Sequence, residues 1–141
     1  MIELTIALPV LLFMCLATAE FGRALFQYNT LTKSVRDGAR HAANVALLGS
    51  TGVVNITDAS LQTEIKTLVV HANTGGSGAI LLPGLSTNDV TVTNAGGGDI
   101  QVSASYNYQP MVGAILPDFG LAGGGTGLTF TLRATVRMRA L

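Results

Sequence analysis

The chain has 141 residues, of which 48% are hydrophobic and only 11% are charged, and its mean hydropathy is +0.48. Eight basic and eight acidic residues give a net charge of zero, which excludes a strongly basic protein and predicts no nucleic acid as a partner. The length allows one compact domain with an appended segment. The single cysteine, Cys15, can form no disulfide within the chain.

The first stretch of the chain is apolar, since residues 4–19 carry no charge. A run of this length is at the short end of what spans a bilayer, so we expect a membrane anchor. A cleaved secretory signal peptide is the alternative, because Ala17-Thr18-Ala19 resembles a cleavage site. The basic region of a signal peptide does not precede the run, and Glu3 stands in its place.

The apolar run continues without a break into a pattern typical of an amphipathic helix, with apolar residues every three or four positions. The stripe consists of Phe21, Leu25, Tyr28, Leu31 or Thr32, Val35, Ala39, Ala42 and Ala46. We expect one helix over residues 1–48, roughly 70 Å long at about 1.5 Å per residue, ending at Gly49-Ser50-Thr51-Gly52.

Three residues of this helix have consequences of their own. Pro9 removes one backbone hydrogen bond, so we expect a kink or a locally extended stretch around residues 7–9. Glu20 and Arg23 are three positions apart, where opposite charges on a helix support each other weakly.

Residues 49–141 are predicted to form a head domain. Thr57 or Asp58 can cap a second helix that ends near Ala72. The expected buried face of this helix consists of Leu61, Ile65, Leu68, Val69 and Ala72. The period then changes to two: residues 90–94 and 100–108 flank the glycine-rich turn 95–99, and residues 128–138 alternate without error. We therefore predict an α+β fold in which the long helix packs on a three-stranded antiparallel sheet.

The motifs of common enzymes and cofactor sites do not occur in this sequence, so we expect no catalytic, cofactor or metal site. His41 and His71 lie on different predicted helices, and we expect each to be solvated or hydrogen-bonded. A catalytic site would require Asp58, His71 and Asp99 to converge.

Two surface features leave alternatives open. Arg133, Arg137 and Arg139 are either a stripe for a partner's acidic groups or a solvated face. Glu3 is either an interfacial carboxylate among lipid head groups or the partner of a neighbouring subunit's N-terminal amine. Pairing would reduce the cost of placing a carboxylate in apolar surroundings.

The N-terminal motifs resemble those of a known family. These motifs are Met1-Ile-Glu-Leu-Thr-Ile-Ala-Leu-Pro-Val-Leu-Leu12, then Glu20-Phe-Gly-Arg-Ala-Leu25 and Val35-Arg-Asp-Gly-Ala-Arg-His-Ala-Ala43. In order and spacing they are similar to the TadE-like pilins and pseudopilins of tight-adherence systems, within the type IV pilin superfamily. The specific part covers about the first 43 residues, and Tyr106-Asn-Tyr108-Gln-Pro110 and Arg137-Met-Arg139 are similar to the family's tail less specifically.

The resemblance implies a pilin-like fold and a subunit that a prepilin peptidase processes, that waits in the bacterial inner membrane and that then enters an extracellular filament. It implies as partners membrane lipid, the pilus assembly machinery and copies of the chain itself. In such pilins the fifth residue of the mature chain is a carboxylate that neutralises a neighbour's N-terminal amine. The matching residue here, Glu3, is the third, which leaves the processing site open.

Two functions follow as expectations. The first is a structural subunit of a type IV-like pilus that polymerises through its apolar helix. The second is a membrane-anchored minor pseudopilin or assembly factor that primes or caps a filament. In either case we expect the assembly residues to be Met1, Glu3, Pro9, Glu20 and Arg23.

Overall fold

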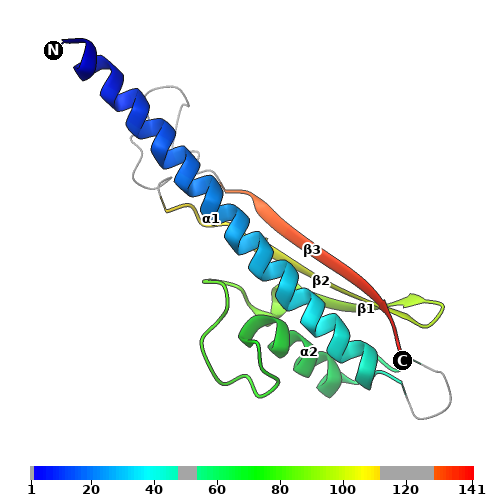
Figure 1. Cartoon of the computed structure of the whole chain (residues 1–141). Helices are drawn as coiled ribbons and strands as arrows, with labels where there is room; N and C mark the ends of the chain where they lie inside the picture. Colours follow the sequence, from blue (N-terminus) through cyan, green and yellow to red (C-terminus); the bar gives the residue numbers. More distant parts are fainter. Residues whose placement is uncertain (1, 48–53, 112–128) are drawn as a thin grey trace. The chain divides into compact units, whose positions relative to one another are not determined.

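The computed structural model describes residues 2–47, 54–111 and 129–141 (Figure 1). Its helices and strands are, in chain order, α1 (Ile2–Val45), α2 (Ala59–His71), the 3-10 turn η2 (Thr87–Asp89), β1 (Val90–Gly96), β2 (Asp99–Asn107) and β3 (Thr131–Arg139). The predicted α+β class is confirmed: a long N-terminal helix, a short helix and a three-stranded antiparallel sheet. The predicted stop of the first helix at residues 49–52 lies outside the described residues.

The chain divides into two compact units. The first unit is Met1–Gln27 with Tyr108–Phe130, and the second is Tyr28–Asn107 with Thr131–Leu141. Helix α1 contributes residues to both units. The predicted division at residue 48 stays a prediction.

Helix α1 is continuous through Pro9. The locally extended stretch expected around residues 7–9 is therefore not formed. An interior proline lacks one donor, but the remaining i to i−4 hydrogen bonds on either side of it hold the helix together.

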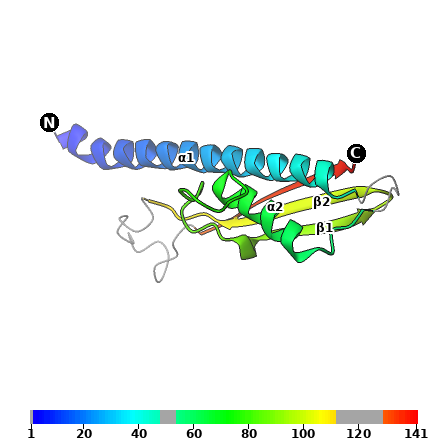
Figure 2. The same ribbon diagram turned by 90° about the horizontal axis from the view of Figure 1, so that it is seen from below.

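The second unit has a core built from the later part of the stripe predicted for the first helix, whereas Phe21, Leu25 and Tyr28 of the same predicted stripe are exposed. Leu31, Val35, Ala39, Ala42 and Ala46 are all buried. Figures 1 and 2 show residues 28–45 of α1 running alongside the sheet and α2. Leu61, Ile65, Val69 and Val70 of α2 are buried as well.

The buried face predicted for α2 differs from the observed one at three residues. Leu68 is only half-buried and Ala72 is exposed, whereas Val70 is buried. Ala72 is the C-cap in the left-handed region, with φ +58°, so it has left the helix and its face. The predicted N-cap is confirmed, because the Asp58 side chain accepts a hydrogen bond from the backbone N–H of Ser60.

The sheet has the order β1-β2-β3 with antiparallel pairing throughout. Its register aligns Val92 with Val102 and Val102 with Val136, so apolar side chains share one face. On β3 the predicted alternation is confirmed from residue 131 onward: Thr131, Arg133, Thr135, Arg137 and Arg139 are exposed, and the residues between them are buried or half-buried. The predicted start of this strand at residue 128 lies outside the described residues.

The hairpin turn is tighter than residues 95–99. Strand β1 extends to Gly96 and β2 begins at Asp99, with an irregularity between Asn94 and Gly96. Gly96, Gly97 and Gly98 have φ values of +79°, +68° and +86°, which other residues rarely adopt. The glycine run therefore serves the geometry of this turn.

Candidate functional site

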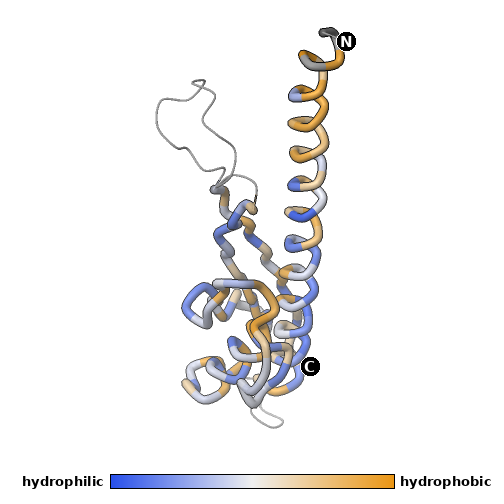
Figure 3. Tube along the Cα trace, turned by 90° about the vertical axis from the view of Figure 1, so that its left-hand side faces the viewer, coloured by the Kyte–Doolittle hydropathy of each residue, from blue (hydrophilic) through white to orange (hydrophobic). Residues whose placement is uncertain are grey.

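The N-terminal half of α1 exposes apolar side chains around its whole circumference. Its exposed large residues are Leu4, Ile6, Leu8, Val10, Leu11, Leu12, Phe13, Met14, Leu16, Phe21, Leu25 and Phe26. Figure 3 shows the same segment in predominantly hydrophobic colours. Among the described residues, α1 is the helix that is long and apolar enough to cross a membrane. A helix that is apolar all round requires lipid or other chains to cover it.

The structure gives only the backbone position of the predicted pairing residue. Glu3 lies in α1, next to the exposed Leu4, and its side chain is outside the described part of the structure. Met1 lies outside the described residues altogether. The pairing of Glu3 with a neighbouring amine therefore stays a prediction.

Glu20 lies where the apolar run ends, and it forms contacts across 88 and 91 positions of sequence. Its carboxylate accepts hydrogen bonds from the Tyr108 hydroxyl and from the backbone N–H of Met111, the latter at 3.0 Å. The Tyr108 hydroxyl also lies 3.3 Å from the backbone oxygen of Glu20. These contacts belong to the first unit, and they fasten the segment after β2 to the helix.

Tyr108 is the other half of this arrangement. Its side chain is only 1% exposed, and its ring stacks on Phe130 with 4.8 Å between ring centroids and 25° between the planes. The backbone N–H of Tyr108 donates to the Phe130 oxygen at 2.9 Å. A buried tyrosine hydroxyl needs a hydrogen-bond partner, and the Glu20 carboxyl group supplies one. Sequence reasoning missed this contact, for which the polar and aromatic run before Pro110 was the only signal.

Arg23 is half-buried, one turn of α1 after Glu20. Its support of Glu20 on the helix stays a prediction. Pro9 is exposed within the apolar segment. The structure therefore brings none of the other predicted assembly residues into a described cluster with Glu20.

In the second unit a pair of side chains joins α1 to α2. His41 Nε2 lies 3.1 Å from Glu64 Oε1, and both side chains are partly exposed. One turn earlier on α1, Gly38 is buried where α2 comes close, facing Val69 and Ile65. The expectation of a hydrogen-bonded histidine is confirmed for His41.

The three residues that a catalytic site would need do not converge. Asp58 caps the start of α2, and His71 is the last residue of this helix. The 13 residues of α2 separate them by about 20 Å, at about 1.5 Å per residue. Asp99 binds Arg137 through its Oδ2, 2.9 Å from Arg137 Nε. Within residues 2–47, 54–111 and 129–141 no group of three or more His, Cys, Asp or Glu could hold a metal ion.

The hydrogen bonds of Asp58 also shift its titration. The hydroxyl and the backbone N–H of Ser60 both donate to the carboxylate, at 2.7 and 3.0 Å, and they lower the pKa of Asp58 below its usual value. The hydrogen bonds that cap the helix therefore favour the ionised form of this carboxylate.

Comparison with known protein families gives a match to the N-terminal part of the chain. Residues 1–40 match the family described as TadE-like protein, and this region contains the apolar segment and Glu20. Neither a curated protein nor a solved structure matches the chain.

Proposed function

We propose that this chain is a structural subunit of the pilus filament of a Tad system. The match of residues 1–40 to the TadE-like family supports a pilus-associated protein of such systems. The observation that supports this proposal is the exposed apolar half of α1. Covering one such leucine, valine or phenylalanine side chain gains about 1.5–3 kcal/mol. Lipid covers these side chains before assembly, and the helices of neighbouring copies cover them in the filament.

Assembly in this proposal depends on Glu3. The apolar core of a filament would leave an isolated carboxylate without water, at a high energetic cost. A neighbouring subunit's N-terminal amine neutralises Glu3 when the subunit enters in register, so the charge pair favours the correct axial position. In this proposal Met1, two residues before Glu3, and Pro9, six residues after it, belong to the same contact region.

The proposal also covers the partners of the protein, its location and its lack of a catalytic activity. A prepilin peptidase processes the chain, the inner membrane holds it, and the pilus machinery transfers it to an extracellular homopolymer. The protein works by assembly and adhesion, with no catalytic step, no cofactor and no nucleic acid. Glu20 holds the segment after β2 to α1 at the end of the apolar run.

The first experiment tests abundance. Surface material is sheared from cells, imaged by electron microscopy, and its dominant protein is identified by mass spectrometry. A structural subunit is the main protein of the filaments. If this chain occurs only in membranes, or only in trace amounts in the filaments, the minor pseudopilin or assembly-factor function replaces the proposal.

The second experiment tests the pairing. Breaking a buried pair costs about 3–5 kcal/mol, and about 1.4 kcal/mol corresponds to tenfold. Glu3→Ala should therefore reduce incorporation into filaments at least tenfold while the membrane level of the protein is unchanged. Asp37→Asn is the control, because it removes an exposed carboxylate from the part of α1 that belongs to the second unit. The Asp37→Asn protein should enter filaments at the wild-type level. Normal polymerisation of the Glu3→Ala protein would show that the pairing mechanism is wrong.

A further inference from the structure

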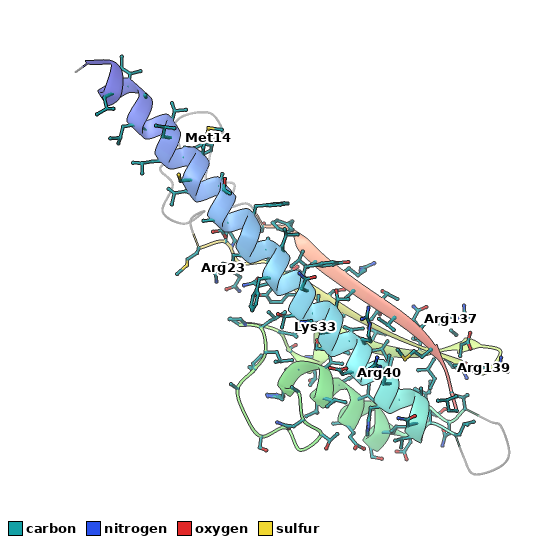
Figure 4. The ribbon with its side chains drawn as sticks, in the orientation of Figure 1. Met14, Arg23, Lys33, Arg40, Arg137 and Arg139 are labelled. Carbon is teal, nitrogen blue, oxygen red and sulfur yellow. The ribbon has the colours of Figure 1, made fainter. Side chains whose placement is uncertain are left out.

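An open groove of about 440 Å³ lies between α1 and the end of β3, within the second unit. Arg40, Ala43 and Asn44 of α1 line one side, and Met138, Arg139 and Leu141 line the other. The backbone N–H of Leu141 donates to the oxygen of Ala43 at 3.0 Å, which holds the two sides together. Figure 4 labels Arg40 on α1 and Arg137 and Arg139 towards the end of β3.

The groove is lined by two arginine side chains, and no ion pair of either is found among the described residues. Arg40 and Arg139 are both exposed, and among the described residues the ion pairs are His41 with Glu64 and Arg137 with Asp99. The acids of this unit are largely committed elsewhere: Asp58 to Ser60, Glu64 to His41, Asp89 to Ser86 and Asp99 to Arg137. Asp37, the acid nearest to Arg40 in sequence, lines a different pocket with Lys33. No acidic side chain is among the described residues that line the groove, so an anionic group would complement Arg40 and Arg139.

The rest of the lining is of two kinds. Asn44 offers an amide that can both donate and accept, while Ala43, Met138 and Leu141 form an apolar wall. The described lining contains no aromatic side chain on which a nucleobase could stack. These three kinds of surface, guanidinium, amide and aliphatic, suit a sugar ring that carries an acidic group. The acidic group would meet the guanidinium groups, the sugar hydroxyls would meet the Asn44 amide, and the C–H groups of the ring would meet the apolar wall.

The groove also continues into a surface. Arg139 belongs to the exposed side of β3, where Thr131, Arg133, Thr135 and Arg137 precede it. Alternate residues of a strand are about 7 Å apart, so Arg133 lies about 13 Å before Arg137 on the same face. Hydroxyls stand between these arginines, and Ser103 pairs with Thr135 on the neighbouring strand. A polymer anchored in the groove can extend along this face.

We propose that the groove between α1 and β3 binds an acidic polysaccharide, with Arg40 and Arg139 holding a carboxylate or sulfate of one sugar unit and Asn44 its hydroxyls. Arginine presents a planar pair of donors that matches such oxyanions. This activity does not depend on whether the chain is a major filament subunit, since the site lies within one unit of one molecule.

The test uses the full chain in detergent micelles and four polymer probes. We expect binding to alginate, which carries carboxylates, and to dextran sulfate, and none to neutral dextran. Alginate and dextran sulfate distinguish the two anion types. Binding should weaken as salt rises from about 0.05 to 0.5 M, because exposed charges are screened. Poly-glutamate, the fourth probe, presents carboxylates as alginate does but has no sugar hydroxyls. It should bind at least threefold more weakly than alginate.

Variants assign the binding to the groove. A hydrogen bond to a charged group contributes about 1.5–3 kcal/mol, so Arg40→Gln/Arg139→Gln should weaken alginate binding at least tenfold, and Asn44→Ala about threefold. Lys33→Gln/Lys66→Gln removes the same number of charges outside the groove and should stay within twofold of the wild type. Circular dichroism checks that each variant is folded.

Four results would overturn the inference. These are no binding of either acidic polysaccharide, equal binding of neutral dextran, equal binding of poly-glutamate, and an equal loss in the Lys33→Gln/Lys66→Gln control. None of them bears on whether the chain polymerises, which sheared filaments report separately.

Discussion

Replacing Gly38 with alanine should destabilise the second unit, although alanine is the better helix former. An added Cβ would lie 2.5 Å from Val69 Cγ2, with the Ile65 oxygen at 3.7 Å and Ile65 Cγ2 at 3.8 Å. Val69 is fully buried and β-branched, so it has little freedom to turn away. The helices must therefore separate or Val69 must leave its preferred rotamer.

The magnitude is a balance of two terms. Overpacking a tight core costs about 1–3 kcal/mol, and exchanging glycine for alanine inside a helix gains about 0.8–1 kcal/mol. We expect a net loss of about 1 kcal/mol. For a domain of this size the melting temperature should fall by about 4–8 °C.

Gly22 supplies the matched control on the same helix. A Cβ added there would meet no atom within 4 Å, so only the gain in helix propensity remains. Gly22→Ala should leave the melting temperature unchanged or raise it. Thermal unfolding of the full chain in detergent, followed by circular dichroism, measures both variants.

A double variant tests the cause. Val69→Ala removes the side chain that the new Cβ would meet. The free energy of unfolding that Val69→Ala costs should therefore be smaller in the Gly38→Ala background than in the wild type. The reasoning is refuted if Gly38→Ala stabilises the protein as Gly22→Ala does. It is equally refuted if the effects of Gly38→Ala and Val69→Ala simply add.

Two further predictions concern the local contacts of acidic residues. Glu20→Ala should speed hydrogen exchange at the Met111 amide, because its acceptor is removed, whereas Glu64→Ala should not; equal protection of Met111 in both variants would contradict the Glu20 contact. For Asp58, the hydrogen bonds from Ser60 lower the folded-state pKa, so the carboxylate contributes stability above its unfolded pKa of about 3.9 and loses it as pH falls through the lower folded value. The stability advantage of the wild type over Asp58→Ala, measured by urea unfolding, should be full at pH 7 and shrink below about pH 4. Asp58→Asn keeps a cap without a titrating group and should not show this change; a constant advantage down to pH 2 would contradict the assignment.

The sequence by itself determined the elements of this protein. Apolar spacing on α1 predicted that Leu31, Val35 and Ala39 would share a buried stripe, and Asp58 marked the start of α2. The alternation on β3 separated exposed arginines from inward residues. Helix caps, and the repeat of apolar residues about every 3.6 positions in a helix or every 2 in a strand, depend on residues within a few positions of each other. They can therefore be recognised in the sequence alone. The same spacing also identified the apolar half of α1 that nothing within the described chain covers.

Only the tertiary structure decided which distant side chains meet. Glu20 looked like a surface partner of Arg23, and it binds Tyr108 and Met111. Arg40 and Arg139 stand 99 positions apart in the sequence and line one groove. Such contacts follow from helix packing and strand register, where a shift of one residue moves a strand's side chains to the other face. Periodicity assigns a residue to a face, but only packing determines what that face contacts.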